Sequence, residues 1–211
     1  MNRAHSPLPQ VLLEGVPALR AVLRGNGAYP GLLGEVLLYP WQEGTLLVTR
    51  AAGLPRDGFF ALHIHTLGCC RTGGDIPFYC AGGHFDPQQQ PHPDHAGDLP
   101  VLLSHRGRAF SVTFTGRFRP EEVLGRSVVL HESPDDYRSQ PAGDAGGRIA
   151  CGVIDTEMNA CFSEEERAQL AEEIPAGRFG APEEVASLAV QITTGNDYLT
   201  GQIITLDGGY L

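Results

Sequence analysis

Short apolar runs alternate with turn residues through most of the chain, from residue 21 to residue 154. The runs are separated by Gly, Pro and Asp, which is typical of strands joined by short turns. The predicted strands cover residues 20–24, 33–39, 45–52, 59–65, 109–115, 126–131 and 148–153. Strands of this length and spacing predict an all-β fold class, either an antiparallel sandwich or a barrel.

The pattern changes after Ile154, where helical signals replace strand signals. A capping-box sequence over residues 163–166 predicts a helix that continues to about Ile174. Pro182, followed by two glutamates, predicts the first turn of a second helix, whose apolar residues then recur at helical spacing. Residues 203–206 predict one short strand. The tail is therefore predicted to hold two helices and a strand, with no sheet for that strand to join.

These patterns divide the chain into three parts: an N-terminal extension (1–20), a β-domain (21–154) and a C-terminal tail (155–211). The tail carries eleven acidic residues and two arginines, whereas the remainder carries fourteen acidic residues and thirteen arginines. Lysine does not occur in the sequence. A nearly neutral domain joined to an acidic tail argues against nucleic-acid binding by either part.

Hydropathy and cysteine content indicate a globular protein without a membrane span. The sequence contains no run of 18 apolar residues. Glu14 and Pro17 interrupt the apolar stretch near the N-terminus, so no secretory signal is predicted and a cytoplasmic location is expected. Five cysteines are too few for a disulfide scaffold, and one structural disulfide with free thiols left over is expected.

Histidines are concentrated where strand signals are weakest or strands end. In the strand that contains His63 and His65, period-two alternation places both imidazoles on the face opposite Leu62 and Ile64. The long stretch 68–100 has almost no strand signal, and structureless loops of that length in a compact domain are usually functional. Six of the eight histidines lie in this strand, in this loop or at the end of the predicted strand 126–131. Histidines scattered over the surface would not be concentrated in this way.

The loop itself holds a set of residues suited to zinc. His84 lies in the sequence Gly-His-Phe-Asp-Pro, and His92, His95 and Asp98 follow it. Three imidazoles and one carboxylate form a tetrahedral zinc set with no open position, as a structural site requires. A further histidine, His131, ends the predicted strand 126–131.

The five motifs together resemble the copper–zinc superoxide dismutase family. In order, they are H-x-H, G-H-F-D-P, H-x-x-D, V-V-L-H-E-x-x-D-D and G-G-R-I-A-C-G-V-I, over about residues 21–154. The resemblance implies a Greek-key β-sandwich and disproportionation of superoxide to oxygen and hydrogen peroxide. It implies copper bound by His63, His65, His84 and His131, and zinc bound by His84, His92, His95 and Asp98.

The same resemblance assigns roles to four further residues. Asp135 matches a carboxylate that orients ligand histidines of both metals. Arg148 matches the arginine that draws the anion toward copper. Cys70 matches the cysteine that pairs with Cys151, although Cys69 and Cys80 are nearby competitors in the sequence. The spacing of His92 and His95 is shorter than in better-known members, which indicates a shortened zinc loop.

Residues 152–211 resemble a different family, the short-chain dehydrogenases/reductases, and most of all the ketoacyl-carrier-protein reductases. The motifs are G-V-I-D-T-E-M, I-P-A-G-R-F-G, P-E-E-V-A and T-G-Q…D-G-G. The segment contains neither the Gly-rich cofactor turn nor a Tyr-x-x-x-Lys sequence, so dehydrogenase chemistry is not expected. The main hypothesis is a superoxide dismutase with an added tail, and a homo-oligomer is possible. The alternative is a protein that stores or buffers copper and zinc without turnover.

Overall fold

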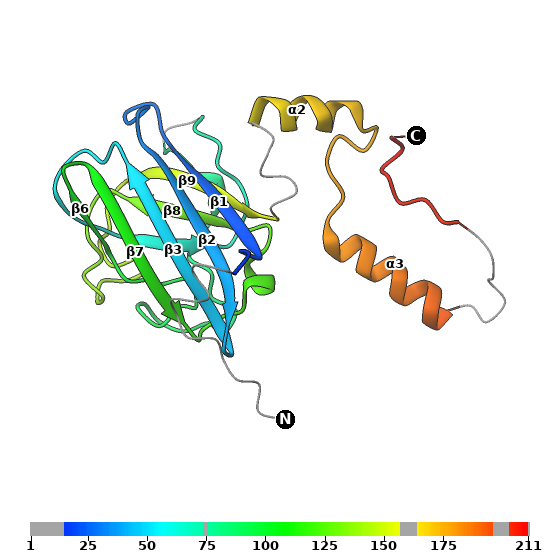
Figure 1. Cartoon of the computed structure of the whole chain (residues 1–211), viewed down its shortest axis with the longest axis horizontal. Coiled ribbons are helices and arrows are strands. Elements are labelled where there is room, and N and C mark those ends of the chain that lie inside the picture. Colours follow the sequence, from blue (N-terminus) through cyan, green and yellow to red (C-terminus); the bar gives the residue numbers. More distant parts are fainter. Residues whose placement is uncertain (1–14, 74–75, 157–163, 196–202, 211) are drawn as a thin grey trace. The chain divides into compact units, whose positions relative to one another are not determined.

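The computed structural model describes residues 15–73, 76–156, 164–195 and 203–210. The chain divides into two compact units, residues 1–160 and residues 161–211. The first unit contains the predicted β-domain, and the second contains the helical tail (Figure 1).

Antiparallel strands build the described part of the first unit. They are β1 (Leu19–Gly25), β2 (Leu33–Trp41), β3 (Gly44–Ala52), β4 (Gly58–Phe60), β5 (Leu62–His65), β6 (Leu102–His105), β7 (Arg108–Thr115), β8 (Ser127–His131) and β9 (Arg148–Asp155). They form one sheet of order β4-β6-β7-β3-β2-β1-β9-β8-β5. Pairing of β3 with β7 and of β1 with β9 joins strands far apart in the sequence, as in a Greek key. The predicted all-β fold class is confirmed.

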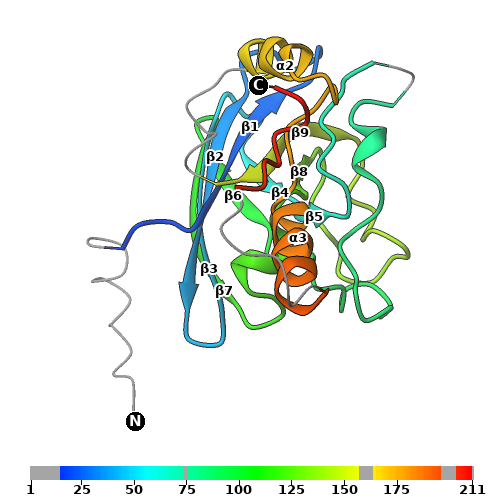
Figure 2. The ribbon, with the colours of Figure 1, turned by 90° about the vertical axis from the view of Figure 1, so that its right-hand side faces the viewer.

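The sheet nearly closes on itself. Strands β4 and β5 stand at opposite ends of the strand order, yet only Ala61 separates them in the sequence. The carbonyl oxygen of Ala61 accepts a hydrogen bond from the amide of His131, at 2.9 Å. Figure 2 shows β2, β3 and β7 in one layer, with the long loops beyond β5, β8 and β9 on the other side. Those loops cover the face of β5 that carries the histidines.

Burial follows from this closure. In β1, Leu19, Ala21 and Leu23 are buried and alternate with more exposed residues, as expected for a strand with one face toward the core. In β5 and β8, by contrast, every residue is buried. One face of these two strands packs in the core and the other lies under the loops. A histidine in β5 therefore has no route to bulk water except through the site it helps to form.

The structure differs from the sequence-based prediction in four places. The predicted strand 59–65 is two strands, because the chain passes from one end of the sheet to the other at Ala61. Strand β6 was not predicted. The predicted strand over residues 203–206 is wrong: these residues have no strand conformation, and Ile203 is 97% exposed. Strand β1 also begins two residues before the predicted domain boundary, at Leu19.

The second unit contains two α-helices among its described residues, α2 (Glu164–Glu173) and α3 (Pro182–Gly195). Both lie where the sequence predicted helices, although Ser163, the predicted cap, is outside the described residues. Arg178 forms two hydrogen bonds with the carboxylate of Glu184, at 2.7 and 2.8 Å. Two 3-10 helices occur in the first unit, η1 (Tyr79–Ala81) and η2 (Pro120–Val123). No described helix combines the length and the apolar character needed to cross a membrane.

Candidate metal centre

Strands β5 and β8 bring three histidines together. His63 and His65 lie two residues apart on one face of β5, and His131 ends the neighbouring strand β8. His84 joins them from the loop, where it forms an isolated bridge with His65. One ring nitrogen from each of the four lies within 4.8 Å of the other three. These are the four residues predicted to bind copper.

Hydrogen bonds fix which nitrogen of each imidazole carries a proton. Nε2 of His63 lies 2.8 Å from a carboxylate oxygen of Asp135, which can only accept, so Nδ1 of His63 keeps its lone pair. Nδ1 of His65 donates to the carbonyl oxygen of Gly82 at 2.9 Å, which leaves the lone pair on Nε2. Nε2 of His65 then lies 3.3 Å from Nε2 of His131. Nδ1 of His131 lies 3.4 Å from the carbonyl oxygen of Gly146, which can only accept, so Nε2 of His131 also presents a lone pair, and a metal ion can satisfy both lone pairs.

A second cluster forms around Asp98. Its Oδ1 is 2.6 Å from Nδ1 of His84, and its Oδ2 is 3.1 Å from Nδ1 of both His92 and His95. Nε2 of His92 donates to Asp135, so Nδ1 of His92 presents a lone pair to the Asp98 carboxylate. Nδ1 of His92 and the Asp98 carboxylate are both acceptors, and a metal ion bound between them would satisfy both. The shortened loop brings His92 and His95 to Asp98, and the four predicted zinc ligands lie together.

His84 belongs to both clusters. Its Nδ1 faces Asp98, whereas its Nε2 is buried and has no hydrogen-bond partner among the described residues. Its ring lies 4.0 Å from that of His63 and 5.4 Å from that of His95, centroid to centroid. An imidazole can serve two metals only if each nitrogen points to a different one. His84 has this orientation.

Asp135 connects the two clusters through hydrogen bonds with one histidine of each. Its two carboxylate oxygens accept from Nε2 of His63 at 2.8 Å and from Nε2 of His92 at 2.9 Å. The carboxylate is completely buried, as are both imidazoles. A carboxylate in this position can fix the tautomer and ring orientation of neighbouring histidines, which is the role that the resemblance implied for Asp135.

Electrostatics keep the histidines in the form that binds metal. Burial lowers the pKa of His65 to about 2 and that of His131 to about 3, and it also lowers the pKa of His84. These imidazoles are therefore neutral at neutral pH. Burial opposes ionisation of Asp98 and Asp135, but hydrogen bonds from the histidines outweigh it and the pKa of each carboxyl is lowered. The site thus combines neutral nitrogen donors with charged carboxylates.

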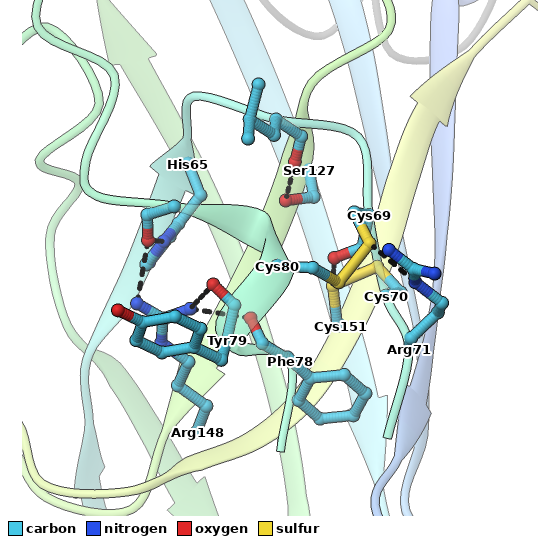
Figure 3. Close-up of a disulfide and its surroundings, with 12 residues drawn as sticks. His65, Cys69, Cys70, Arg71, Phe78, Tyr79, Cys80, Ser127, Arg148 and Cys151 are labelled. Atoms are coloured by element: carbon cyan, nitrogen blue, oxygen red, sulfur yellow. Dashed lines mark hydrogen bonds between the residues drawn. A yellow bond between two sulfur atoms is a disulfide. The ribbon is translucent and has the colours of Figure 1, made fainter. Parts of the chain in front are cut away.

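Arg148 lies at the mouth of this site. A pocket of about 670 Å³ is lined by His65, His84, His131 and Arg148, and by residues of the loop 139–146. The guanidinium donates hydrogen bonds to the carbonyl oxygens of Phe78 at 2.6 Å and Gly82 at 2.7 Å (Figure 3). These bonds hold the head group beside histidines predicted to bind copper.

Two disulfides flank the site. Cys70 is bonded to Cys151, the pairing that the resemblance implied, and Cys69 is bonded to Cys80. The expectation of one disulfide with free thiols is therefore wrong for Cys69 and Cys80. The two pairings coexist because adjacent cysteines reach different partners: Cys70 reaches strand β9, and Cys69 reaches η1 (Figure 3). The fifth cysteine, Cys161, lies outside the described residues.

Three residues that hold the zinc loop were missed in the sequence. The side chain of Gln140 accepts from the amide of His92 at 3.1 Å and donates to its carbonyl oxygen at 2.7 Å. Arg117 donates to the carbonyl oxygens of Pro93 and His95, each at 2.9 Å. Gly143 has a positive φ of 66°, and a Cβ there would lie 1.9 Å from Oδ1 of Asp135. Gln140 and Arg117 contact residues more than 20 positions away in the sequence, and no local sequence pattern indicates any of these three residues.

Comparison with known proteins agrees with this geometry. Residues 33–154 match the family described as copper/zinc superoxide dismutase, and residues 148–211 match one described as enoyl-(acyl carrier protein) reductase. A Cu-Zn superoxide dismutase of Deinococcus radiodurans is 37% identical over 158 residues, 66% of this chain and 85% of the relative. One from Aquifex aeolicus is 36% identical over 138 residues, 58% of this chain and 79% of the relative.

A solved structure shows the same fold. The Cu/Zn superoxide dismutase from Brucella abortus aligns with a TM-score of 0.58 and 28% sequence identity, and covers 64% of this chain and 98% of its own. The reductase-like match begins within β9, so the two family matches overlap over residues 148–154. The first match spans more than half of the chain and includes every residue of both clusters. The chain belongs to the copper/zinc superoxide dismutase family.

Proposed function

We propose that this chain disproportionates superoxide to oxygen and hydrogen peroxide at copper held by His63, His65, His84 and His131. The observation that carries the proposal is the convergence of four imidazoles, three of which line one pocket together with Arg148. Copper held by these residues would supply one-electron redox chemistry, accepting an electron from one superoxide anion and returning it to a second. Histidine ligation suits both oxidation states of copper.

Zinc bound by His84, His92, His95 and Asp98 has a structural role in this proposal. The four ligands leave no position for a substrate, and Asp98 is buried between them. The carboxylate of Asp135 fixes the orientation of His63 and His92 together, so ordering of one cluster also orders the other. Zinc thus helps to hold the copper ligands in place.

Arg148 binds and orients the anion. Its guanidinium is always charged and presents several donors, and only some of them are used on the carbonyl oxygens of residues 78–82. The remaining N–H groups can meet a small oxyanion in the pocket. A cation at the mouth of a partly buried pocket also raises the local concentration of an anionic substrate.

His84 is the residue best placed to hold a proton for the product. Its buried Nε2 faces the copper cluster and has no competing hydrogen bond from the described residues. Peroxide formed in the pocket needs protons, and Nε2 of His84 could take one up only while it is released from copper, and then pass it to the product. Bulk water is the second source, since the pocket opens to solvent beside Arg148.

We further propose that the chain works in an oxidising compartment, in place of the cytoplasmic location expected from the N-terminus. Two disulfides in one small domain support this, because such bonds persist in oxidising surroundings and are rare in the cytosol. Assembly into a homo-oligomer, on which the sequence gives no signal, stays a prediction.

The decay of superoxide in the presence of copper- and zinc-loaded protein tests the proposal. We expect the loaded chain to accelerate the decay and the metal-free chain to leave it unchanged. Arg148→Ala should lower the rate about tenfold or more at low ionic strength, with copper content unaltered. Arg108→Ala, which removes an exposed charge at the start of β7, is the control. A chain that binds copper fully but leaves the decay unchanged would instead be a metal-storage protein.

A further inference from the structure

The guanidinium of Arg148 is held by a single short segment, residues 78–82. Nη1 donates to the carbonyl oxygen of Phe78 at 2.6 Å, and Nη2 donates to that of Gly82 at 2.7 Å. The carbonyl oxygen of Tyr79 lies 3.4 Å from Nη1. The position of the charge therefore depends on the position of this segment, which contains η1.

One side of the segment is exposed, and its anchors are few. Tyr79 is 72% exposed, and in the described residues the backbone is tied to its neighbours by bonds from Leu67 to Ala81 and from Phe78 to Arg71. Phe78 is buried beside Cys70 and Cys151. At the end of the segment, Nδ1 of His65 donates to the carbonyl oxygen of Gly82, and a further anchor is covalent, because Cys80 of η1 is bonded to Cys69.

The two disulfides together form a covalent path from the arginine to its acceptors. Cys151 follows Arg148 by three residues on β9 and is bonded to Cys70. Cys70 adjoins Cys69, which is bonded to Cys80 within the segment 78–82. Figure 3 shows both sulfur bridges beside the hydrogen bonds between Arg148 and this segment.

We propose that the Cys69–Cys80 disulfide is a positioning element for the anion site: it holds residues 78–82 so that their carbonyl oxygens fix the guanidinium of Arg148. The inference rests on the proposed role of Arg148 and deepens it. Without the disulfide, the segment can shift, and its carbonyl oxygens no longer hold the guanidinium of Arg148 in one position. The side chain must then become ordered when an anion binds, which weakens binding of the anion. We expect the metals still to bind without this disulfide, because none of the proposed ligands lies within residues 69–80 and His65 stays within strand β5.

A double-mutant cycle tests this. The four proteins are the wild type, Cys69→Ser/Cys80→Ser, Arg148→Ala and the triple variant, each loaded with copper and zinc. The affinity for azide, an inert anion, is measured from the visible absorption of the copper(II) protein, together with the superoxide decay rate. We expect Cys69→Ser/Cys80→Ser to weaken azide binding about three- to tenfold, the cost of ordering one long side chain. In the Arg148→Ala background the same substitutions should change nothing further.

Two additional measurements separate positioning from a general loss of stability. In the metal-free protein, nitrogen NMR signals of the Arg148 guanidinium should be distinct in the wild type and broadened in Cys69→Ser/Cys80→Ser. Arg71→Ala is the matched control, because Arg71 is exposed and contacts Cys69 Sγ from outside. It should leave azide affinity unchanged. Should the cysteine variant fail to fold, Tyr79→Gly loosens the same segment with both disulfides intact and should weaken azide binding similarly.

The outcomes distinguish this inference from the proposed function. Equal losses of azide affinity in the wild-type and Arg148→Ala backgrounds would show that the disulfide acts on the whole domain and would overturn the inference. So would an unchanged azide affinity in both Cys69→Ser/Cys80→Ser and Tyr79→Gly. If Arg148→Ala itself leaves azide affinity and superoxide decay unchanged, the role proposed for Arg148 fails, and the inference fails with it.

Discussion

His65 and Arg148 donate hydrogen bonds to the same acceptor, the carbonyl oxygen of Gly82, at 2.9 and 2.7 Å. A single backbone atom therefore sets the distance between a proposed copper ligand and the proposed anion guide. Gly82 has a positive φ of 78°, a conformation that glycine adopts at low cost. Backbone geometry thus explains the glycine at position 82, two residues before His84.

Asp135→Asn should weaken zinc binding about 10- to 100-fold, the usual effect of losing an outer partner of a metal ligand. The amide keeps the shape of the carboxylate but replaces one acceptor with a donor, so either His63 or His92 must give up its Nε2–H bond. Zinc affinity is measured by competition with a chelator. Asp57→Asn makes the same change at an exposed site and should have no effect. Equal affinities for the wild type and Asp135→Asn would contradict the orienting role.

Gly143→Ala should lower both stability and zinc affinity, because its Cβ would lie 1.9 Å from Oδ1 of Asp135 and 2.7 Å from Nε2 of His92. The backbone strain of a positive φ adds about 1 kcal/mol. Gly125→Ala is the matched control: its φ is also positive, at 73°, and a Cβ there would meet no described atom within 4 Å. Thermal unfolding and chelator competition measure the two effects. If both variants lose the same stability and neither loses zinc affinity, the close approach at Gly143 has no role.

The metal-free protein should lose stability as pH falls below about 6.5, the ordinary pKa of histidine. The pKa values of His65 and His131 are lowered to about 2 and about 3, so the unfolded chain binds protons that the folded chain does not. In the pH range well below 6.5 and above its pKa in the folded protein, each of these two histidines lowers the free energy of unfolding by about 1.4 kcal/mol for each unit that the pH falls.

Urea unfolding between pH 6 and pH 4.5 measures this slope. His65→Leu should reduce it by about one proton, whereas His105→Leu, at an exposed position, should leave it unchanged. Identical slopes for the wild type and His65→Leu would mean that His65 is not held neutral in the folded protein.

The metal centre was more predictable from sequence than its supports. Ligands such as His63 and His65 occur in short motifs whose spacing follows the strand period. Gln140 and Arg117 act through contacts with residues far away in the sequence, and no local pattern indicates their partners. The second disulfide, Cys69–Cys80, was missed because Cys69, Cys70 and Cys80 lie close together in the sequence. The sequence alone does not show which of them pair with one another.

The fold shows the same division. Long apolar strands such as β3 were predicted closely, whereas β6 has only four residues and two of them are exposed. Residues 203–206 have the composition of a strand but no strand conformation. β-propensity describes how well a residue fits a sheet that is already present, and it cannot supply the neighbouring strand.

Removal of residues 157–211 should leave metal binding and superoxide dismutation intact. The cut falls after Asp155, which is the last residue of β9 and pairs with Arg20 of β1. A cut before Asp155 would also remove part of the sheet, so the boundary matters. Metal content, thermal unfolding and superoxide decay are compared for the two lengths. A truncated chain that unfolds or loses copper would show that the β-domain needs the tail. This would contradict the hypothesis of a superoxide dismutase with an added tail.

The central claim is that two metals share His84, and anomalous diffraction from crystals of the copper- and zinc-loaded protein tests it most directly. Data collected at the two absorption edges locate each metal independently. We predict copper among His63, His65, His84 and His131, and zinc among His84, His92, His95 and Asp98, on opposite nitrogens of the His84 ring. Copper found away from these four histidines, or zinc bound without His84, would contradict the account.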